Sequence, residues 1–122
     1  MKKIFLLLIC IIIFAGCDKP IYEEITADEA YKMINKKDVI VLDVREDNEF
    51  NQGHLENAIN IPFDELEDRF MKEVTSDKDQ IIILYCRSGH RAMIGAETLA
   101  SLGFTNLYTF GSIDDWEYEI VK

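Results

Sequence analysis

One six-residue segment combines a thiol nucleophile with two positive charges. It reads Cys86-Arg87-Ser88-Gly89-His90-Arg91. The apolar run 81–85 in front of it predicts a buried strand, and residues 91–102 have the periodicity of a helix. A thiol at such a junction faces the N–H groups of the loop and the positive end of the helix dipole. Together with the two arginines, these groups favour the thiolate, which is the nucleophilic form of cysteine.

The surroundings that favour a thiolate also bind an oxyanion, and they stabilise the negative charge that develops when the thiolate attacks. Gly89 allows the backbone conformation that such a tight loop needs. The alternative is an inert, buried Cys86 beside two solvated arginines. A structural cysteine has no need of a cationic loop at the end of a strand, so we predict that Cys86 is reactive.

A second pair of charged side chains, Asp43 and Arg45, follows the apolar run 39–42. In an open α/β sheet the reactive site lies beyond the carboxyl ends of the strands, where both the pair and the Cys86 loop are expected. We interpret Asp43 and Arg45 as an ion pair or hydrogen-bonded bracket beneath the site, and not as reactants. No His and Cys residues have the spacing of metal ligands, and we expect neither a metal nor an organic cofactor.

Strand and helix patterns alternate along the chain. The predicted strands span residues 21–25, 39–42, 58–61, 81–85 and 107–110. The predicted helices span residues 27 to about 36, 63–74 and 91–102, with a turn at 51–53. Thr26 and Glu29 form a capping box for the first helix, and the last helix is expected to bury Met93, Ala96, Leu99 and Ala100. This alternation predicts an open α/β sheet with helices on both faces.

The first 17 residues have the pattern of an export signal. Two lysines precede the apolar stretch 4–14, which as a helix would span about 16 Å, roughly half of a bilayer's hydrocarbon core. The run Ile13-Phe14-Ala15-Gly16-Cys17 resembles the lipobox of bacterial lipoproteins, although that family usually has Leu where Phe14 stands. The resemblance implies that the thiol of Cys17 is acylated and that Cys17 becomes the mature N-terminus.

We therefore expect a signal peptide at residues 1–16, a lipidated Cys17 with a linker to residue 24, and one domain at 25–122. The lipid would hold an exported domain at the cell membrane, facing the periplasm or the outside. A plain secretory peptide or an uncleaved anchor is the alternative.

Composition and charge limit the partners of this domain. Apolar residues make up 48% of the 122 residues and there are few glycines and prolines, which argues against disorder. The formal net charge of −10 repels nucleic acid and opposes docking on anionic headgroups. Of three cysteines, Cys10 lies in the predicted signal and Cys17 is the expected acylation site, so Cys86 has no disulfide partner within the domain.

From about residue 25 to 116 the chain contains several motifs that resemble those of the rhodanese-like domains, and they follow one another along the chain in the order typical of that family. They are the Cys86–Arg91 loop, Leu42-Asp43-Val44-Arg45, Glu49 with Gly53-His54, Ala58-Ile59-Asn60-Ile61-Pro62, Leu102-Gly103-Phe104, and Gly111 with Trp116. The resemblance implies a five-stranded parallel sheet with helices on both sides. It also implies that Cys86 carries a persulfide and that Asp43 and Arg45 lock the structure near the site.

Three positions depart from the pattern of the family. Glu56-Asn57 stands where Pro-Gly is common, and Ser112 replaces the second glycine of a Gly-Gly pair, so that turn needs a different backbone conformation. Ala92 replaces a Ser or Thr whose hydroxyl can face the sulfur, which affects the expected rate and substrate preference. The nucleophile and its loop are retained.

Loop length favours sulfur transfer. Relatives of this fold with one more residue between Cys and Arg resemble phosphatases and arsenate reductases, whereas four residues separate Cys86 from Arg91. We expect the Cys86 thiolate to take sulfane sulfur from thiosulfate or a polysulfide and pass it to cyanide, sulfite or a thiol. Arg91 and the loop amides would stabilise the persulfide, and Arg87, Ser88, Gly89 and His90 would form the substrate-binding loop with Arg87 at its mouth.

Two other functions stay open. One is a sulfur carrier or a module that binds a redox partner protein without turnover. The other, disfavoured by loop length, is a phosphatase or arsenate reductase.

Overall fold

The computed structural model describes residues 20–122, and the predicted signal peptide and Cys17 lie outside the described residues. The strands are β1 Glu23–Glu24, β2 Val39–Asp43, β3 His54–Leu55, β4 Ile59–Asn60, β5 Ile81–Cys86, β6 Leu107–Ser112 and β7 Ile120–Val121. The α-helices are α1 Ala27–Lys36, α2 Asp47–Gln52, α3 Leu66–Glu73 and α4 His90–Ser101, with short 3-10 turns η1 Phe63–Glu65 and η2 Ile113–Asp115.

The main sheet has five strands in the order β1-β6-β5-β2-β4, and every neighbouring pair is parallel. This confirms the expected five-stranded parallel sheet. The register sets Asp43 at the end of β2 beside Tyr85 of β5, one residue before Cys86. The ends of β2 and β5 therefore lie together at one edge of the sheet, as their positions in the sequence predict.

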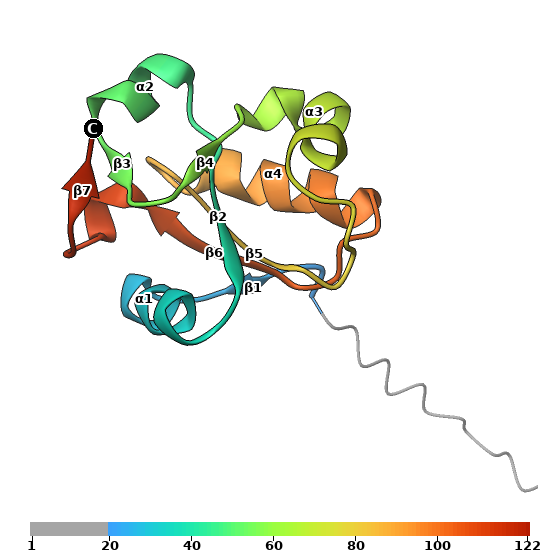
Figure 1. Ribbon diagram of the computed structural model, residues 1–122, viewed down its shortest axis with the longest axis horizontal. Helices are drawn as coiled ribbons and strands as arrows, with labels where there is room; N and C mark the ends of the chain where they lie inside the picture. Colours follow the sequence, from blue (N-terminus) through green and yellow to red (C-terminus); the bar gives the residue numbers. More distant parts are fainter. Residues whose placement is uncertain (1–19) are drawn as a thin grey trace, which may run out of the picture.

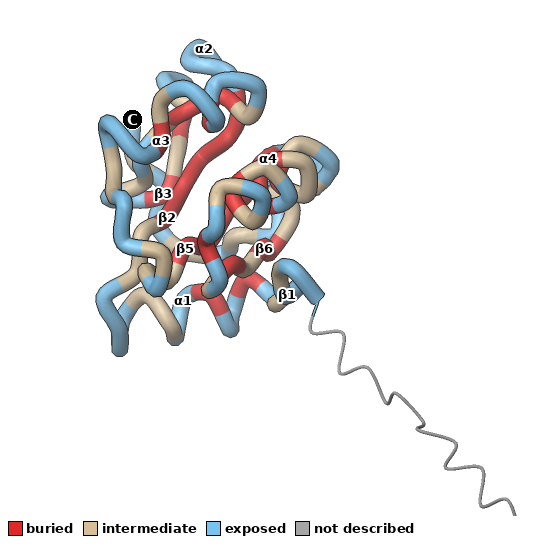
Figure 2. Tube along the Cα trace, turned by 90° about the vertical axis from the view of Figure 1, so that its right-hand side faces the viewer, coloured by how far each residue is buried: buried red, intermediate tan, exposed pale blue. Residues whose placement is uncertain are grey.

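Helices cover both faces of this sheet, with α3 and α4 on one face and α1 on the other (Figure 1). The central strand β5 supplies both cores, because successive side chains of a strand point to opposite faces. Ile82, Leu84 and Cys86 pack in the cluster that contains residues of α3 and α4. Ile83 and Tyr85 pack in the cluster that contains residues of α1. Buried backbone runs along β2 and β5 between these layers (Figure 2).

The face that α4 turns to the sheet agrees with the expected one only in part. Its buried residues are Ala92, Gly95, Ala96 and Leu99, whereas Met93 and Ala100 are only half-buried. A Cβ atom on Gly95 would lie 3.0 Å from Leu66 Cδ1 and 3.1 Å from Leu84 Cδ2, so the helix packs very closely on the sheet and on α3. Small side chains allow this approach. Ala96 and Leu99 are buried as expected and Ala100 packs against the core, whereas Ala92 and Gly95 take the place expected for Met93.

One helix, α2, and one two-stranded ribbon were not expected from the sequence. Residues 51–53 were predicted as a turn, but α2 extends to Gln52, and the turn begins only at Gly53. The helix has no buried residue and is capped by reciprocal hydrogen bonds between Glu46 and Glu49. Strands β3 and β7 form a separate two-stranded antiparallel ribbon. No helix within residues 20–122 is both long enough and apolar enough to span a bilayer.

The N-cap of α1 is the predicted Thr26. Its hydroxyl oxygen accepts the backbone N–H of Glu29 at 3.1 Å. The second half of the expected capping box differs, because the Glu29 carboxylate contacts the Thr26 hydroxyl at 3.2 Å instead of a backbone amide.

Candidate active site

Cys86 is the last residue of β5 and is fully buried. The chain then passes through Arg87 and Ser88 and enters α4 after Gly89, which is its N-cap. Gly89 has a φ of 93° and a ψ of −21°, a left-handed conformation that a residue with a Cβ atom adopts only with strain. The tight turn that Gly89 was expected to permit is therefore present, and it aims the start of α4 back at the sulfur.

Two backbone amides at the start of α4 donate hydrogen bonds to the sulfur. The N–H of Gly89 lies 3.0 Å from Cys86 Sγ, and the N–H of Ala92 lies 3.4 Å from it. Amides at a helix N-terminus carry partial positive charge, so both stabilise negative charge on the sulfur. Ala92 thus contributes its backbone N–H to the sulfur site, although its side chain has no hydroxyl.

The carboxyl end of β6 lies against this loop. A Cβ atom on Gly89 would lie 3.6 Å from the Cα of Gly111, which itself has a φ of 83°. Ser112 next to it is extended, with a φ of −108° and a ψ of 133°, and its hydroxyl accepts the N–H of Asp114 at 3.0 Å. The Gly-to-Ser departure at position 112 therefore adopts an ordinary extended backbone and caps η2. Asn57, at the other departure, has a φ of 63°, which Asn tolerates better than most residues.

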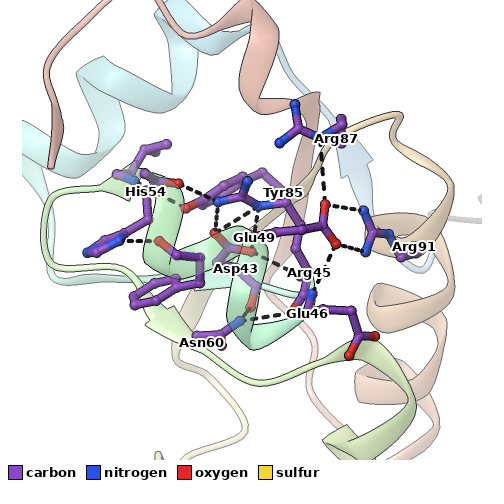
Figure 3. Close-up of polar contacts among 12 residues, drawn as sticks. Asp43, Arg45, Glu46, Glu49, His54, Asn60, Tyr85, Arg87 and Arg91 are labelled. Atoms are coloured by element: carbon purple, nitrogen blue, oxygen red, sulfur yellow. Dashed lines mark hydrogen bonds and ion pairs between the residues drawn. The ribbon is translucent and has the colours of Figure 1, made fainter. Parts of the chain in front are cut away.

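Arg91 forms a paired contact with Glu49 of α2 (Figure 3). Its Nη1 lies 2.6 Å from Glu49 Oε1, and its Nη2 lies 3.0 Å from Oε2. The hydrogen bonds from Arg91 lower the pKa of Glu49 to about 2, against the effect of burial and with help from the backbone N–H of Glu46. The pKa of Arg91 is raised, chiefly by the hydrogen bond to Glu49, and the charge of Cys86 contributes.

The position of Arg91 differs from the direct contact with the sulfur that its expected role requires. Within residues 20–122 the hydrogen bonds to Cys86 Sγ come from backbone amides, and the guanidinium of Arg91 bonds to Glu49 instead. A direct contact of Arg91 with a persulfide stays a prediction. The sequence marks Glu49 only as part of a family motif. Its place beside the loop depends on α2, which sequence periodicity did not reveal.

Arg87 lies at the mouth of the loop, with half of its side chain exposed, and faces two carboxylates. Its Nε is 3.6 Å from Glu49 Oε2, and its Nη1 is 3.6 Å from Asp114 Oδ1. The expected position at the mouth agrees with the structure, whereas the flanking acids were not anticipated. Ser88 and His90 are exposed, and with Met93 they line a groove on the other side of the loop.

Asp43 and Arg45 form the expected ion pair. Arg45 Nε lies 3.0 and 3.1 Å from the two carboxylate oxygens of Asp43, and Arg45 Nη2 lies 2.7 Å from Oδ2. Both side chains are buried, at 1% and 0% exposure. Burial lowers the pKa of Arg45, but the hydrogen bonds and charge of Asp43 outweigh it and the pKa is raised.

The pair also connects the segment that carries Glu49 to the sheet. Arg45 Nη2 donates to the carbonyl of Gly53 at 2.7 Å, directly after α2. The side-chain amide of Asn60 donates to the carbonyls of Asp43 and Arg45 at 3.0 and 2.9 Å. Arg45, paired with Asp43, thus holds the C-terminal end of α2 near the end of β2. Their contacts are structural, as a bracket beneath the site requires.

His54 and Tyr85 support the same region. His54 Nδ1 hydrogen-bonds the carbonyl of Phe50 at 2.9 Å, and the two rings stack at 3.6 Å. The hydroxyl of Tyr85 accepts the N–H of Leu55 at 3.1 Å, and burial is the main cause of the raised pKa of Tyr85. In the part of the chain that the structure describes, no group of His, Cys, Asp and Glu side chains could hold a metal ion.

Comparison with known proteins matches these features to one family. The family model of the rhodanese-like domain matches residues 26–119. A thiosulfate sulfurtransferase, GlpE, of Coxiella burnetii is 27% identical over 97 residues, which cover 79% of this chain and 88% of the relative.

Two solved structures are similar in sequence and in fold. A rhodanese-related protein of Thermoplasma volcanium is 32% identical with a TM-score of 0.70, covering 82% of this chain and 98% of the other. A rhodanese with anions from E. coli is 31% identical with a TM-score of 0.64, covering 69% and 98%. Together with the loop at Cys86, these matches show that the chain belongs to the family of rhodanese-like domains.

Proposed function

We propose that the protein is a rhodanese-type sulfurtransferase that carries sulfane sulfur as a persulfide on Cys86. The observation that carries this proposal is the pair of backbone N–H groups, from Gly89 and Ala92, that donate to Cys86 Sγ. They stabilise the attacking thiolate, and after the transfer they lie beside the anionic persulfide. The relationship to GlpE, which is named a thiosulfate sulfurtransferase, supports the same activity.

The reaction needs two displacements at sulfur. The thiolate of Cys86 attacks the outer sulfur of the donor, a new S–S bond forms, and the donor's own bond to that sulfur breaks. The electron pair of the broken bond leaves with the rest of the donor, which is sulfite when thiosulfate reacts. An acceptor such as cyanide, sulfite or a thiol then attacks the terminal sulfur, and the electron pair of the persulfide bond returns to Cys86 as thiolate.

The loop suits sulfur better than a tetrahedral oxyanion. Four residues separate Cys86 from Arg91, and Arg91 is already bonded to both oxygens of Glu49. A phosphate or arsenate needs several donors directed at it at once, and two N–H groups of Arg91 are already directed at Glu49. This supports sulfur transfer over phosphatase or arsenate reductase activity.

We also propose that the enzyme acts outside the cytoplasm, held at the membrane by lipid on Cys17. The basis is the sequence of residues 1–17, with its basic start, apolar stretch and lipobox-like end. The strongly acidic composition gives the domain no electrostatic attraction to anionic lipids, so the lipid itself would provide the anchor.

A mass measurement tests the sulfurtransferase proposal. After treatment with thiosulfate or a polysulfide, a digest of the purified protein should show one added sulfur atom on the peptide with Cys86. Cyanide should remove that sulfur and yield thiocyanate. The Cys86→Ser variant should gain no sulfur and should keep the circular dichroism of the wild type, because Ser is similar in size and its hydroxyl can accept the loop's hydrogen bonds.

Two outcomes would contradict the proposal. Sulfur that stays on Cys86 in the presence of cyanide, sulfite and thiols would indicate a carrier without turnover. No added sulfur from any donor would indicate a module that does not handle sulfane sulfur at all.

A further inference from the structure

The two cations of the loop are each matched by a carboxylate. Arg91 is bonded through both terminal nitrogens to Glu49, and Arg87 lies 3.6 Å from Glu49 Oε2 and 3.6 Å from Asp114 Oδ1. Two positive charges of the Cys86 loop therefore face two negative charges from α2 and η2. Such a mouth attracts anions far less than the loop's two arginines alone would suggest.

The side chain of Ser112 fixes the backbone of Asp114. The hydroxyl of Ser112 accepts the N–H of Asp114 and caps the short turn η2. The side chain of Asp114 is 68% exposed and that of Arg87 is 50% exposed, so a donor that approaches Arg87 from solvent meets Asp114 as well. Glu49 is committed to Arg91, which leaves Asp114 as the carboxylate that pairs with Arg87 alone.

The groove beside Arg87 also has an apolar part. Ile113 and Ile120 line it together with Glu49, Arg87 and Asp114. Ile120 is 41% exposed, and apolar surface of this kind gains from contact with an organic group. The groove thus offers little net charge and some hydrophobic contact.

We propose that Asp114 determines donor selectivity, so that the site prefers organic sulfane-sulfur donors with a single negative charge over the compact thiosulfate dianion. The proposal rests on the sulfurtransferase function proposed above. Repulsion between Asp114 and a donor scales with the donor's charge, so the dianion suffers about twice the penalty of a monoanion at the same distance. An organic donor also places its apolar part against Ile113 and Ile120.

Thiosulfate and benzenethiosulfonate form a suitable pair of probes. Each gives its outer sulfur to the Cys86 thiolate and forms the same persulfide. Thiosulfate releases sulfite, and benzenethiosulfonate releases benzenesulfinate, with the electron pair of the broken S–S bond in both cases. The two donors differ in charge and in the apolar ring, and the enzyme's acceptor step is the same.

The full-length chain, purified in detergent, is assayed with each donor and with cyanide as acceptor. The Asp114→Asn variant should raise the ratio of kcat/KM for thiosulfate to kcat/KM for benzenethiosulfonate by about two- to fivefold, as expected for the loss of one exposed charge contact. The change should lie in KM for thiosulfate, with kcat unaltered. Asp115→Asn is the matched control, because Asp115 is exposed, adjacent in sequence and has no ion pair among residues 20–122. It should leave the ratio unchanged.

The outcomes separate this inference from the function on which it rests. An equal change of the ratio in both variants would show that net charge acts, and it would overturn the role of Asp114. An unchanged ratio in Asp114→Asn, or a change confined to kcat, would overturn it too. If neither donor loads Cys86 of the wild type with sulfur, the proposed function itself fails and the inference fails with it.

Discussion

Glu49 in α2 binds both terminal nitrogens of Arg91 in α4, at 2.6 and 3.0 Å, across 42 residues of sequence. The contact joins the helix that follows β2 to the helix that follows Cys86. It fixes the direction of Arg91 at the rim of the sulfur site. Because Arg87 also lies near Glu49, this carboxylate organises both arginines of the loop.

The Glu49–Arg91 contact should make stability depend on pH in the acid range. Hydrogen bonds from Arg91 lower the pKa of Glu49 from 4.5 to about 2, so the folded state favours the ionised carboxylate. The stabilisation is complete above the unfolded pKa and is lost as the pH falls toward 2. Glu49→Gln should lower Tm by roughly 5 °C at neutral pH, and the difference from the wild type should shrink between pH 4.5 and 2.

Thermal unfolding followed by circular dichroism at a series of pH values measures this. Glu67→Gln is the control, since Glu67 is exposed on α3 and has no ion pair in the described part of the chain. Its Tm should follow that of the wild type at every pH. A deficit in Glu49→Gln that stays constant down to pH 2 would mean that the carboxylate's charge is not the cause.

A comparison of Gly89→Ala with Gly103→Ala should distinguish the effect of the loop conformation on sulfur transfer from its effect on the stability of the fold. Gly89 has a φ of 93°, and Gly103 after α4 has a φ of 101°. Alanine at either position should cost about 1–2 kcal/mol of unfolding free energy, because a Cβ atom strains the left-handed conformation. Only Gly89→Ala should also slow sulfur transfer, by about a hundredfold, since its N–H would turn away from Cys86 Sγ.

Urea unfolding and a thiocyanate assay on both variants give the comparison. Gly103→Ala is matched in backbone conformation and lies away from the loop, beside Lys78. If the two variants lose the same fraction of activity, the N–H of Gly89 has no special role in the reaction.

The buried pair of Asp43 and Arg45 should be among the most sensitive points of the fold. Asp43→Ala leaves the charge of Arg45, at 1% exposure, without its carboxylate and should cost about 3–5 kcal/mol. Glu73→Ala removes one partner of the exposed pair with Arg69 and should cost far less, because solvent screens that pair. Urea unfolding measures both. If Asp43→Ala is too unstable to purify, Asp43→Asn replaces it, because the amide keeps hydrogen-bonding groups; its loss of unfolding free energy should lie between those of Asp43→Ala and Glu73→Ala. Equal losses for Asp43→Asn and Glu73→Ala would contradict the structural role of the buried ion pair.

The strands that carry the site could be predicted from the sequence because they are buried on both faces. The apolar runs before Asp43 and Cys86 became β2 and β5, and their parallel pairing brought the two ends together. The loop conformation was also foreseeable, since Gly89 stands where a left-handed residue is needed. Both features can be recognised in the local sequence, because a buried strand needs a run of apolar residues and a left-handed position favours glycine.

The charges around the loop could not be predicted in the same way. Helix α2 buries no residue, so it has no apolar periodicity, and it depends on the capping contacts of Glu46 and Glu49. Without α2, neither the contact of Glu49 with Arg91 nor its approach to Arg87 could be inferred. Asp114 lies in the turn η2 after β6, and its approach to Arg87 depends on how the end of β6 lies beside the Cys86 loop, which is a tertiary arrangement that local sequence does not contain.

The location of the protein should depend on Cys17. Each buried methylene of an acyl chain contributes about 0.8 kcal/mol, and one myristoyl chain gives only marginal binding, so stable anchoring needs more than one chain. Cys17→Ser should therefore prevent lipidation and release the chain from membranes after fractionation if cleavage occurs elsewhere. The mass of the product must be measured as well, because an uncleaved apolar stretch at residues 4–14 would keep the variant at the membrane for a different reason.

A chain that begins at Asp18 is the matched test of the enzyme without its anchor. The sulfur site is built from residues 43–114, far along the chain from Cys17. Because it lacks the predicted lipid anchor, the shortened protein should stay in the supernatant after fractionation. It should transfer sulfur at the rate of the full-length protein, measured as thiocyanate formed from the same donor. If it stays with membranes, or is folded but inactive, the division into a lipid anchor and an independent sulfurtransferase domain is wrong.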